Sequence, residues 1–239
     1  MIISHKHQFI YIKARKTAGT SIEIALSSIC GKDDIITPIS KKDEKVRKKL
    51  GFLGAQNYFI PRKKYTKYDK YNFFTEFKKA QFYNHIPCSE VINYVDKKTW
   101  NSYFKFTIER NPFDKVVSFY YWSGSDQKYN NISEFIADGG LRKIAAYDLY
   151  SINNVVAVDK IYKFENLNYF LTDLSERLNL EKVLRLPLFK AKSHTRKVKR
   201  YQDILDREAI EMIEIIFARE LKLLNYQSMV RYGLVKTSS

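Results

Sequence analysis

The chain has 239 residues and carries 42 Lys and Arg against 26 Asp and Glu, a formal net charge of +16. That length suffices for one or two domains with a sizeable core, and the charge favours anionic partners such as nucleotides, acidic glycans, nucleic acid or anionic lipid, although lysines spread over solvated faces would give the same balance. Two cysteines exclude a disulfide framework, and the lack of an apolar signal core or of any apolar run near the ~18 residues of a membrane span predicts a cytoplasmic protein without a transmembrane segment.

The first informative stretch is a short apolar run that changes abruptly to cations, small residues and hydroxyls. Residues 9–12 are β-branched or aromatic, which predicts a strand buried on both faces. The small residues that follow, Ala18 and Gly19, let the backbone present N–H groups to a ligand. We expect Thr20 or Ser21 to cap a helix that ends near residue 31. A helix N-terminus beside a lysine is a site for phosphate or sulfate.

This loop differs from the nucleoside-triphosphate loop, GxxxxGK followed by Ser or Thr. In that loop the Lys follows the last Gly and the next hydroxyl holds magnesium, whereas here Lys16 precedes Gly19 and the hydroxyls lie beyond it. The order therefore favours an anion site that works without a metal. A basic turn before an ordinary helix is the alternative interpretation of this stretch alone.

Residues 32–79 are rich in lysines and aromatic residues and have little clear periodicity. We interpret them as an irregular, substrate-facing insertion, because long irregular stretches are usually functional or mobile. Its aromatic rings would stack on sugar rings while ammonium groups meet carboxylates or sulfates. Alternatively, the rings pack beneath a surface loop.

The segment that follows contains His85, two residues before Pro87. Pro87 biases the preceding residue towards extended geometry, so His85 is expected at a strand or loop end rather than within a helix. Ser89 is expected to cap a short helix.

A second strand-to-helix motif occupies residues 103–118. Residues 104, 106 and 108 alternate as in a strand, Asn111 is expected to cap a helix, and Pro112 fits its first position. Arg110 and Ser118 would then lie on one polar side, where a guanidinium and a hydroxyl share a phosphate. The polar side of this helix is expected to carry Asn111, Asp114, Lys115 and Ser118.

The remaining sequence predicts further elements around one basic loop. They are short helices in 132–148 interrupted at Gly139 and Gly140, strands at 155–158 and 161–164, a helix from 165 to about 178, a basic loop at 189–201 and a last helix capped by Asp206.

Together, K-T-A-G-T-S after one strand and R-N-P-F-D-K-V-V-S after another resemble the PAPS-dependent sulfotransferases, most closely the carbohydrate branch that includes heparan sulfate 2-O-sulfotransferase and its bacterial relatives. The resemblance implies an α/β, three-layer P-loop-like fold with a central, mainly parallel sheet flanked by helices, in a single domain over 1–239. It also implies PAPS (3′-phosphoadenosine-5′-phosphosulfate) as sulfate donor, no metal, and a hydroxyl of a carbohydrate, possibly acidic, as acceptor.

The resemblance also assigns residues. Arg110 and Ser118 would bind the 3′-phosphate, and Ser193 and Arg196, in a loop that closes over the nucleotide in similar enzymes, are further candidates. His85 would act as general base, as a His in a similar H-x-P-like segment does in related enzymes. The first loop would bind the 5′-phosphosulfate through Arg15, Lys16, Thr17, Ala18, Gly19, Thr20 and Ser21, with Lys16 also catalytic. Arg15 departs from the family, which usually has Pro there.

Two other functions stay open at this point. A metal-dependent nucleotide phosphotransferase needs magnesium and an acidic ligand near the loop, and the sequence shows no matching carboxylate pattern. A non-catalytic nucleic-acid-binding protein would fit the charge and the basic loop, but no recognised reading module is present, so no nucleic-acid partner is expected. The role of Glu109 and the oligomeric state are left open.

Overall fold

The computed structural model describes residues 1–187 and 200–229. Its main sheet has five strands in the order β3-β1-β2-β4-β7, and β2, β4 and β7 are parallel while β1 and β3 are antiparallel to their neighbours. The predicted α/β fold is therefore confirmed, with a sheet that is parallel in its middle. The strands are β1 (Ile2–Ser4), β2 (Phe9–Ile12), β3 (Ile35–Ile36), β4 (Phe104–Glu109) and β7 (Lys160–Lys163).

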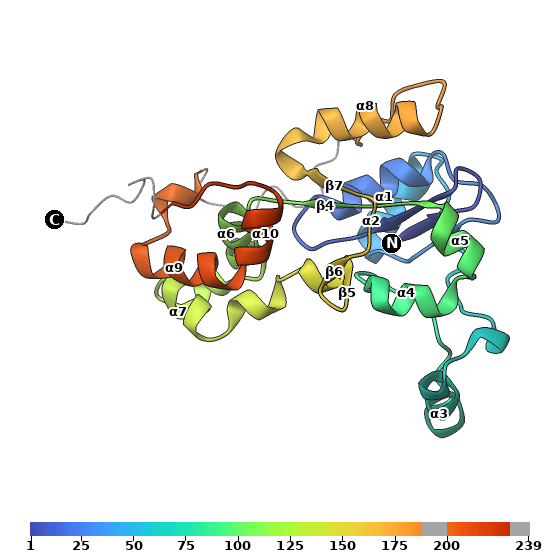
Figure 1. Cartoon of the computed structure of the whole chain (residues 1–239), viewed down its shortest axis with the longest axis horizontal. Helices are drawn as coiled ribbons and strands as arrows, with labels where there is room; N and C mark the ends of the chain where they lie inside the picture. Colours follow the sequence, from blue (N-terminus) through green and yellow to red (C-terminus); the bar gives the residue numbers. More distant parts are fainter. Residues whose placement is uncertain (188–199, 230–239) are drawn as a thin grey trace.

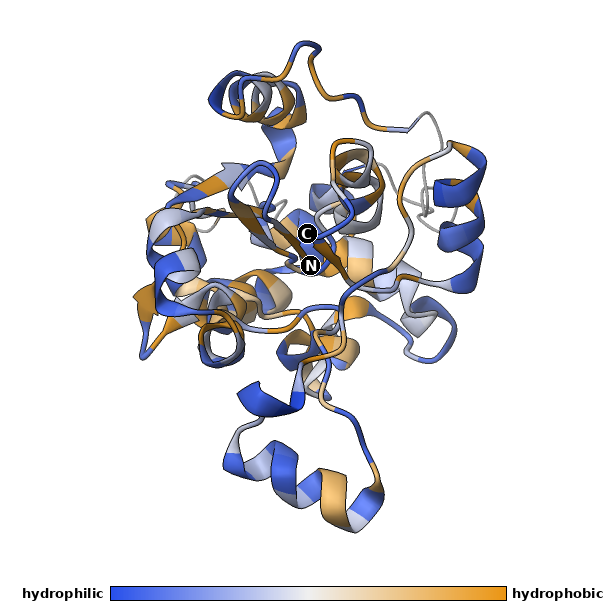
Figure 2. Cartoon of the chain, turned by 90° about the vertical axis from the view of Figure 1, so that its right-hand side faces the viewer, coloured by the Kyte–Doolittle hydropathy of each residue, from blue (hydrophilic) through white to orange (hydrophobic). Residues whose placement is uncertain are grey.

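Helices cover both faces of this sheet (Figure 1). On one face α1 (Gly19–Ser27) and α8 (Leu167–Arg177) pack against Tyr11 and Phe106. On the other, α4 (Cys88–Tyr94) packs against alternate strand residues such as Ile10. Every residue of β2 is buried, as expected for a strand covered on both sides. The hydropathy colouring in Figure 2 accordingly shows apolar strands in the interior.

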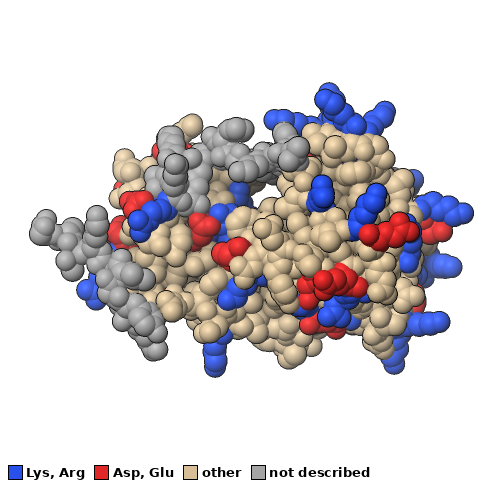
Figure 3. Space-filling model, turned by 90° about the horizontal axis from the view of Figure 1, so that it is seen from above, with Lys and Arg blue, Asp and Glu red and all other residues tan. Residues whose placement is uncertain are grey.

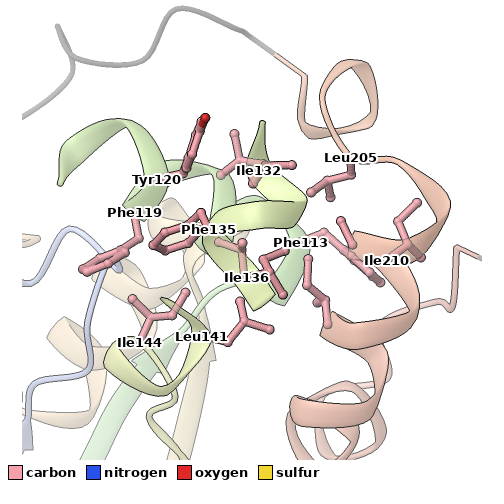
Figure 4. Close-up of a cluster of buried hydrophobic side chains, with 14 of the residues drawn as sticks. Phe113, Phe119, Tyr120, Ile132, Phe135, Ile136, Leu141, Ile144, Leu205 and Ile210 are labelled. Carbon is pink, nitrogen blue, oxygen red and sulfur yellow. The ribbon is translucent and has the colours of Figure 1, made fainter. Parts of the chain in front are cut away.

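A third cluster of apolar side chains lies beside the sheet, and most of its residues belong to helices (Figure 4). Phe113 of α6, Phe135 of α7 and Ile210 of α9 belong to it. Since β4 runs directly into α6, this cluster fixes the start of α6 relative to the sheet (Figure 1). The helices are α6 (Pro112–Trp122), α7 (Ile132–Ala137), α9 (Arg207–Ile216) and α10 (Ala218–Leu223).

The shorter elements largely match the prediction. Asp206 caps α9 by accepting a hydrogen bond from the Ala209 N–H, as expected. The short helices around Gly139 and the helix ending near residue 178 are confirmed. The remaining elements are α5 (Lys97–Ser102), η2 (Ser125–Gln127), η3 (Gly140–Lys143), η4 (Tyr147–Leu149), η5 (Phe164–Asn166) and η6 (Tyr201–Asp203), with the hairpin β5 (Ser151–Ile152) and β6 (Val155–Val156).

The expectation of an irregular 32–79 segment is wrong. It contains η1 (Arg62–Lys64) and two regular helices, α2 (Lys41–Lys49) and α3 (Lys67–Glu76). Their starts carry local capping signals, because Ser40 accepts from the Asp43 N–H and Thr66 forms a reciprocal capping box with Asp69. Exposed, lysine-rich helices lack a broad apolar stripe, so periodicity alone missed them.

Three helix boundaries and three strands also differ from the prediction. Helix α1 begins at Gly19 without a Thr20 or Ser21 cap and ends at Ser27. Helix α4 begins at Cys88, ahead of the expected Ser89 cap. Strands β1, β3 and β5 were not predicted.

Candidate active site

The loop at residues 13–18 joins β2 to α1 with a left-handed backbone at two positions. Lys16 has φ 62° and Ala18 has φ 57°. Ala18 is the N-cap of α1, and no side chain caps this helix. The N–H groups of its first turn are therefore not used by a cap, and together with the positive end of the helix dipole they suit an anion.

A buried ion pair lies directly beneath this loop. Lys13 Nζ is 2.5 Å from Glu23 Oε2, and the amino group of Met1 also contacts Glu23. Burial alone would raise the pKa of Glu23, but these two cations lower it to about 2. A Cβ on Gly19 would lie 2.7 Å from Lys13 Cε, so only glycine lets the first turn of α1 pack on the Lys13 side chain.

His85 lies in the turn before α4, as expected, and contacts the first loop. Its Nδ1 is 2.9 Å from the carbonyl oxygen of Lys13. Because a carbonyl oxygen only accepts, Nδ1 carries the proton and Nε2 has a free lone pair. Burial, together with the charges of Lys13 and Arg15, lowers the pKa of His85 to about 4. The imidazole is therefore neutral at neutral pH, the form that a general base requires.

Arg110 joins the second loop to the first. Its Nη1 donates to the carbonyl oxygen of Lys16 at 3.1 Å, and its Nε donates to Asp114 Oδ2 at 2.6 Å. The guanidinium also lies 4.3 Å from the centre of the Phe164 ring. The two loops are thus neighbours at the carboxyl ends of parallel strands, as the sequence predicted.

The start of α6 is firmly fixed. Asn111 Oδ1 accepts from the Phe113 N–H at 3.0 Å and Pro112 occupies the first helical position, so both predictions are confirmed. Sequence reasoning missed Glu165, which accepts from the Asn111 N–H at 2.8 Å and from the Tyr226 hydroxyl at 2.7 Å. Its position just after a predicted strand was the available signal.

The predicted polar face of α6 is wrong at Lys115. This side chain is fully buried, and its Nζ lies 2.7 Å from Glu109 Oε1. Glu109 also accepts from the Arg110 N–H at 2.9 Å. A charged helix residue can point inward when a buried carboxylate pairs with it, which a helical pattern does not reveal. Glu109 and Lys115 thus support the second loop.

Lys16 and Arg15 also have partners from neighbouring helices. Lys16 Nζ lies 4.7 Å from the centre of the Trp122 ring, at the end of α6. Arg15 Nη1 donates to the carbonyl oxygen of Lys143. Trp122 is 42% exposed beside the lysine, and sequence reasoning did not single it out.

The hydroxyl residues differ in accessibility. Thr17 is buried and donates to the carbonyl oxygen of Ala14 at 3.2 Å. Thr20 and Ser21 are half-buried in the first turn of α1, and Ser118 is half-buried on α6. Ser118 is four residues from Asp114 and therefore lies on the same side of α6 as this partner of Arg110.

A pocket of about 420 Å³ adjoins the second loop and is lined by residues 164–169. Phe164, which contacts Arg110, forms one wall of this pocket. It therefore offers space next to the candidate phosphate-binding arginine. Ser193 and Arg196 lie outside the described residues.

Residues 1–187 and 200–229, which the structure describes, include both cysteines. No group of His, Cys, Asp and Glu side chains there could hold a metal ion, and no helix there is long and apolar enough to cross a membrane. Cys30 and Cys88 are free and buried, and burial raises the pKa of the Cys88 thiol to about 12. Such a thiol is inert at neutral pH.

Comparison with known proteins gives one consistent result. The model of the Sulfotransferase family matches residues 1–227, which include both loops. An uncharacterized protein of Archaeoglobus fulgidus is 31% identical over 104 residues, which are 41% of this chain and 87% of that protein. No solved structure matches the chain. The chain therefore belongs to the sulfotransferase family.

Proposed function

We propose that this protein, acting as a single domain, transfers a sulfuryl group from PAPS to a hydroxyl of a carbohydrate. The observation that carries the proposal is the hydrogen bond between Arg110 Nη1 and the carbonyl oxygen of Lys16. It makes two cationic loops adjacent, and a nucleotide with phosphate groups at both ends needs two such loops. Family membership supports sulfuryl transfer over the phosphotransferase and nucleic-acid-binding alternatives.

The residues of both loops fit such a donor. The uncapped first turn of α1, made accessible by Gly19, would hold the 5′-phosphosulfate together with Lys16. Arg110 and Ser118 would hold the 3′-phosphate. When bound, PAPS supplies a sulfuryl group that is already activated for transfer.

The remaining chemistry belongs to two side chains. His85 Nε2 would accept the proton of the attacking hydroxyl, because its Nδ1 is committed to the Lys13 carbonyl oxygen. Lys16 and the first-turn amides of α1 would place positive charge beside the oxygen that becomes negative as the bond to sulfur breaks. Loss of one such group typically costs ~3 kcal/mol, or about a hundredfold or more in rate.

The carbohydrate acceptor is proposed from the sequence resemblance, and the net charge of +16, with Lys and Arg on the face shown in Figure 3, favours an acidic one. The free, buried cysteines fit a reducing compartment, and the cytoplasmic location stays a prediction.

The proposal is tested by calorimetric titration with 3′,5′-adenosine bisphosphate, followed by sulfate-transfer assays on a panel of glycans. Lys16→Ala and His85→Ala should abolish most turnover, whereas Arg110→Ala should chiefly weaken nucleotide binding. Lys41→Ala, an exposed lysine of α2, is the matched control and should change neither. Absence of bisphosphate binding, or near-normal rates in the first two variants, would reject the assignment.

A further inference from the structure

The segment 61–80, here named the α3 arm, projects from the body of the protein. In both Figure 1 and Figure 2, α3 lies at the outer end of the molecule, apart from the sheet and from the other helices. The arm contains seven Lys and Arg against two Asp and Glu. None of its residues belongs to the candidate active site.

Four large aromatic side chains of the arm are mostly exposed. Phe74 and Phe77 are 76% and 84% exposed, and Tyr68 and Tyr71 are 73% and 65% exposed. Such a group of apolar side chains on one surface is unusual for a soluble protein and marks a site of interaction.

Helix α3 carries its exposed aromatic residues and its acidic residues on different sides. At about 100° per residue, Tyr68, Tyr71 and Phe74 fall within one arc of about 120°, whereas Asp69 and Glu76 fall on the opposite side. Asp69 is only 7% exposed and accepts hydrogen bonds from Thr66 and from the Tyr94 hydroxyl. The face that carries Tyr68, Tyr71 and Phe74 therefore has no carboxylate, and the exposed Glu76 lies on the other side of α3.

The arm's own packing centres on Phe73. Its ring lies 6.1 Å from the Tyr65 ring between centroids, and the Arg62 guanidinium lies 4.5 Å from the Phe73 ring centre. The Ala80 N–H donates to the Tyr65 hydroxyl and connects the end of the arm to its start. Phe74 contacts Phe73 edge-on, with 5.6 Å between centroids, yet it stays 76% exposed and available to another surface.

We propose that the α3 arm docks onto an anionic lipid bilayer. Exposed aromatic rings insert at the level of the lipid headgroups, and lysines around them, such as Lys67, Lys70 and Lys78, are attracted to anionic headgroups. An acidic glycan fits less well, because the arm projects from the body of the protein (Figure 1), whereas sites for such ligands are usually concave.

The test is co-sedimentation of the full chain with vesicles of phosphatidylcholine alone or with added phosphatidylglycerol. We expect binding to the anionic vesicles that weakens as salt is added. Phe74→Ser with Phe77→Ser should weaken it by at least about tenfold. Lys67→Gln with Lys70→Gln should weaken it roughly thirtyfold.

Matched controls carry the same kinds of change outside the arm. Ile215→Ser with Leu223→Ser alters exposed apolar residues of α9 and α10, and Lys48→Gln with Lys49→Gln alters exposed lysines of α2. Both pairs should leave vesicle binding unchanged. Urea unfolding of the arm variants should match that of the wild type, since the altered side chains are exposed.

Three outcomes would overturn the proposal: no preference for anionic vesicles, binding that survives the phenylalanine substitutions, or binding of a soluble acidic polysaccharide that the same substitutions abolish while vesicles are not bound. The assay involves no sulfuryl transfer, so its result is independent of the proposed function.

Discussion

The two strand-loop-helix units of this protein prepare for an anion in different ways. In the first, the backbone is the binding group, with positive φ at Lys16 and Ala18 and a helix without a cap. In the second, Asn111 and Pro112 complete the helix start, and the side chain of Arg110 is the cation. Glycine and small residues are therefore essential in the first loop, whereas the second depends on correct side-chain positions.

Both units are nevertheless supported by a buried lysine-glutamate pair, but the helix supplies the glutamate in one unit and the lysine in the other. In the first, Lys13 comes from the loop and Glu23 from the helix, whereas in the second Glu109 comes from the strand and Lys115 from the helix. Each pair links the end of a strand to the helix that follows. Substitutions in each unit can therefore distinguish residues that stabilise a loop from residues that bind the ligand.

The largest expected effect is on the second pair. Lys115→Met leaves the Glu109 carboxylate buried without its cation, which should lower the free energy of unfolding by about 3–5 kcal/mol. Lys160→Met removes the partly exposed pair between Lys160 of β7 and Asp173 of α8, and it should cost less than about 1 kcal/mol. Urea unfolding measures the free energy of unfolding of both variants. A loss for Lys115→Met as small as that for Lys160→Met would show that the buried pair does not support the fold.

The next effect distinguishes the first unit, because a titrating group, His85, contacts its loop. Folding lowers the pKa of His85 from 6.5 to about 4 by burial, so the unfolded chain binds a proton at a higher pH than the folded one. Relative to His85→Gln, the wild type should therefore lose stability as the pH falls from about 6.5 to about 4, by at most about 3 kcal/mol. Parallel pH-stability curves for the two proteins would contradict the assigned burial.

Much of this comparison could be predicted from the sequence, because it depends on local signals. The strand at residues 9–12, the Asn111 cap and the Pro112 start follow from residue type and spacing. The proximity of the loops followed from parallel strands ending at one edge of a sheet, and the Arg110 contact with Lys16 confirms it. The roles of the site residues in donor and acceptor binding stay predictions.

What the sequence did not reveal depends on tertiary contacts. The sequence does not pair Lys115 with Glu109, because the helical pattern places Lys115 on the polar side of α6, and it does not pair Glu165 with the Asn111 N–H, because these residues are 54 positions apart. The N-cap of helix α1 is Ala18 rather than a hydroxyl residue, and a left-handed N-cap has no strong sequence signal. The capping box at Thr66 was a local signal, and the prediction of an irregular segment overlooked it.

A smaller effect tests the dependence of the first unit on close packing. Gly19→Ala places a Cβ 2.7 Å from Lys13 Cε, whose side chain cannot move freely while it is paired with Glu23. We expect a loss of about 1–3 kcal/mol in unfolding free energy and weaker nucleotide binding. Gly31→Ala is the control, because its nearest neighbour would be a flexible Lys6 carbon at 3.4 Å, and its stability should stay within about 0.5 kcal/mol of the wild type.

The smallest effect separates a cap that positions a binding group from a cap that only completes a helix. Asn111→Ala and Ser40→Ala each remove the side-chain oxygen that caps a helix start, so each should cost about 1 kcal/mol in urea unfolding. Only Asn111 lies beside Arg110, and only its substitution should also weaken 3′,5′-adenosine bisphosphate binding in calorimetry. If both variants bound the nucleotide as the wild type does, the Asn111 cap would stabilise α6 without positioning Arg110. The second unit would then resemble the first in architecture but its helix start would have no part in nucleotide binding.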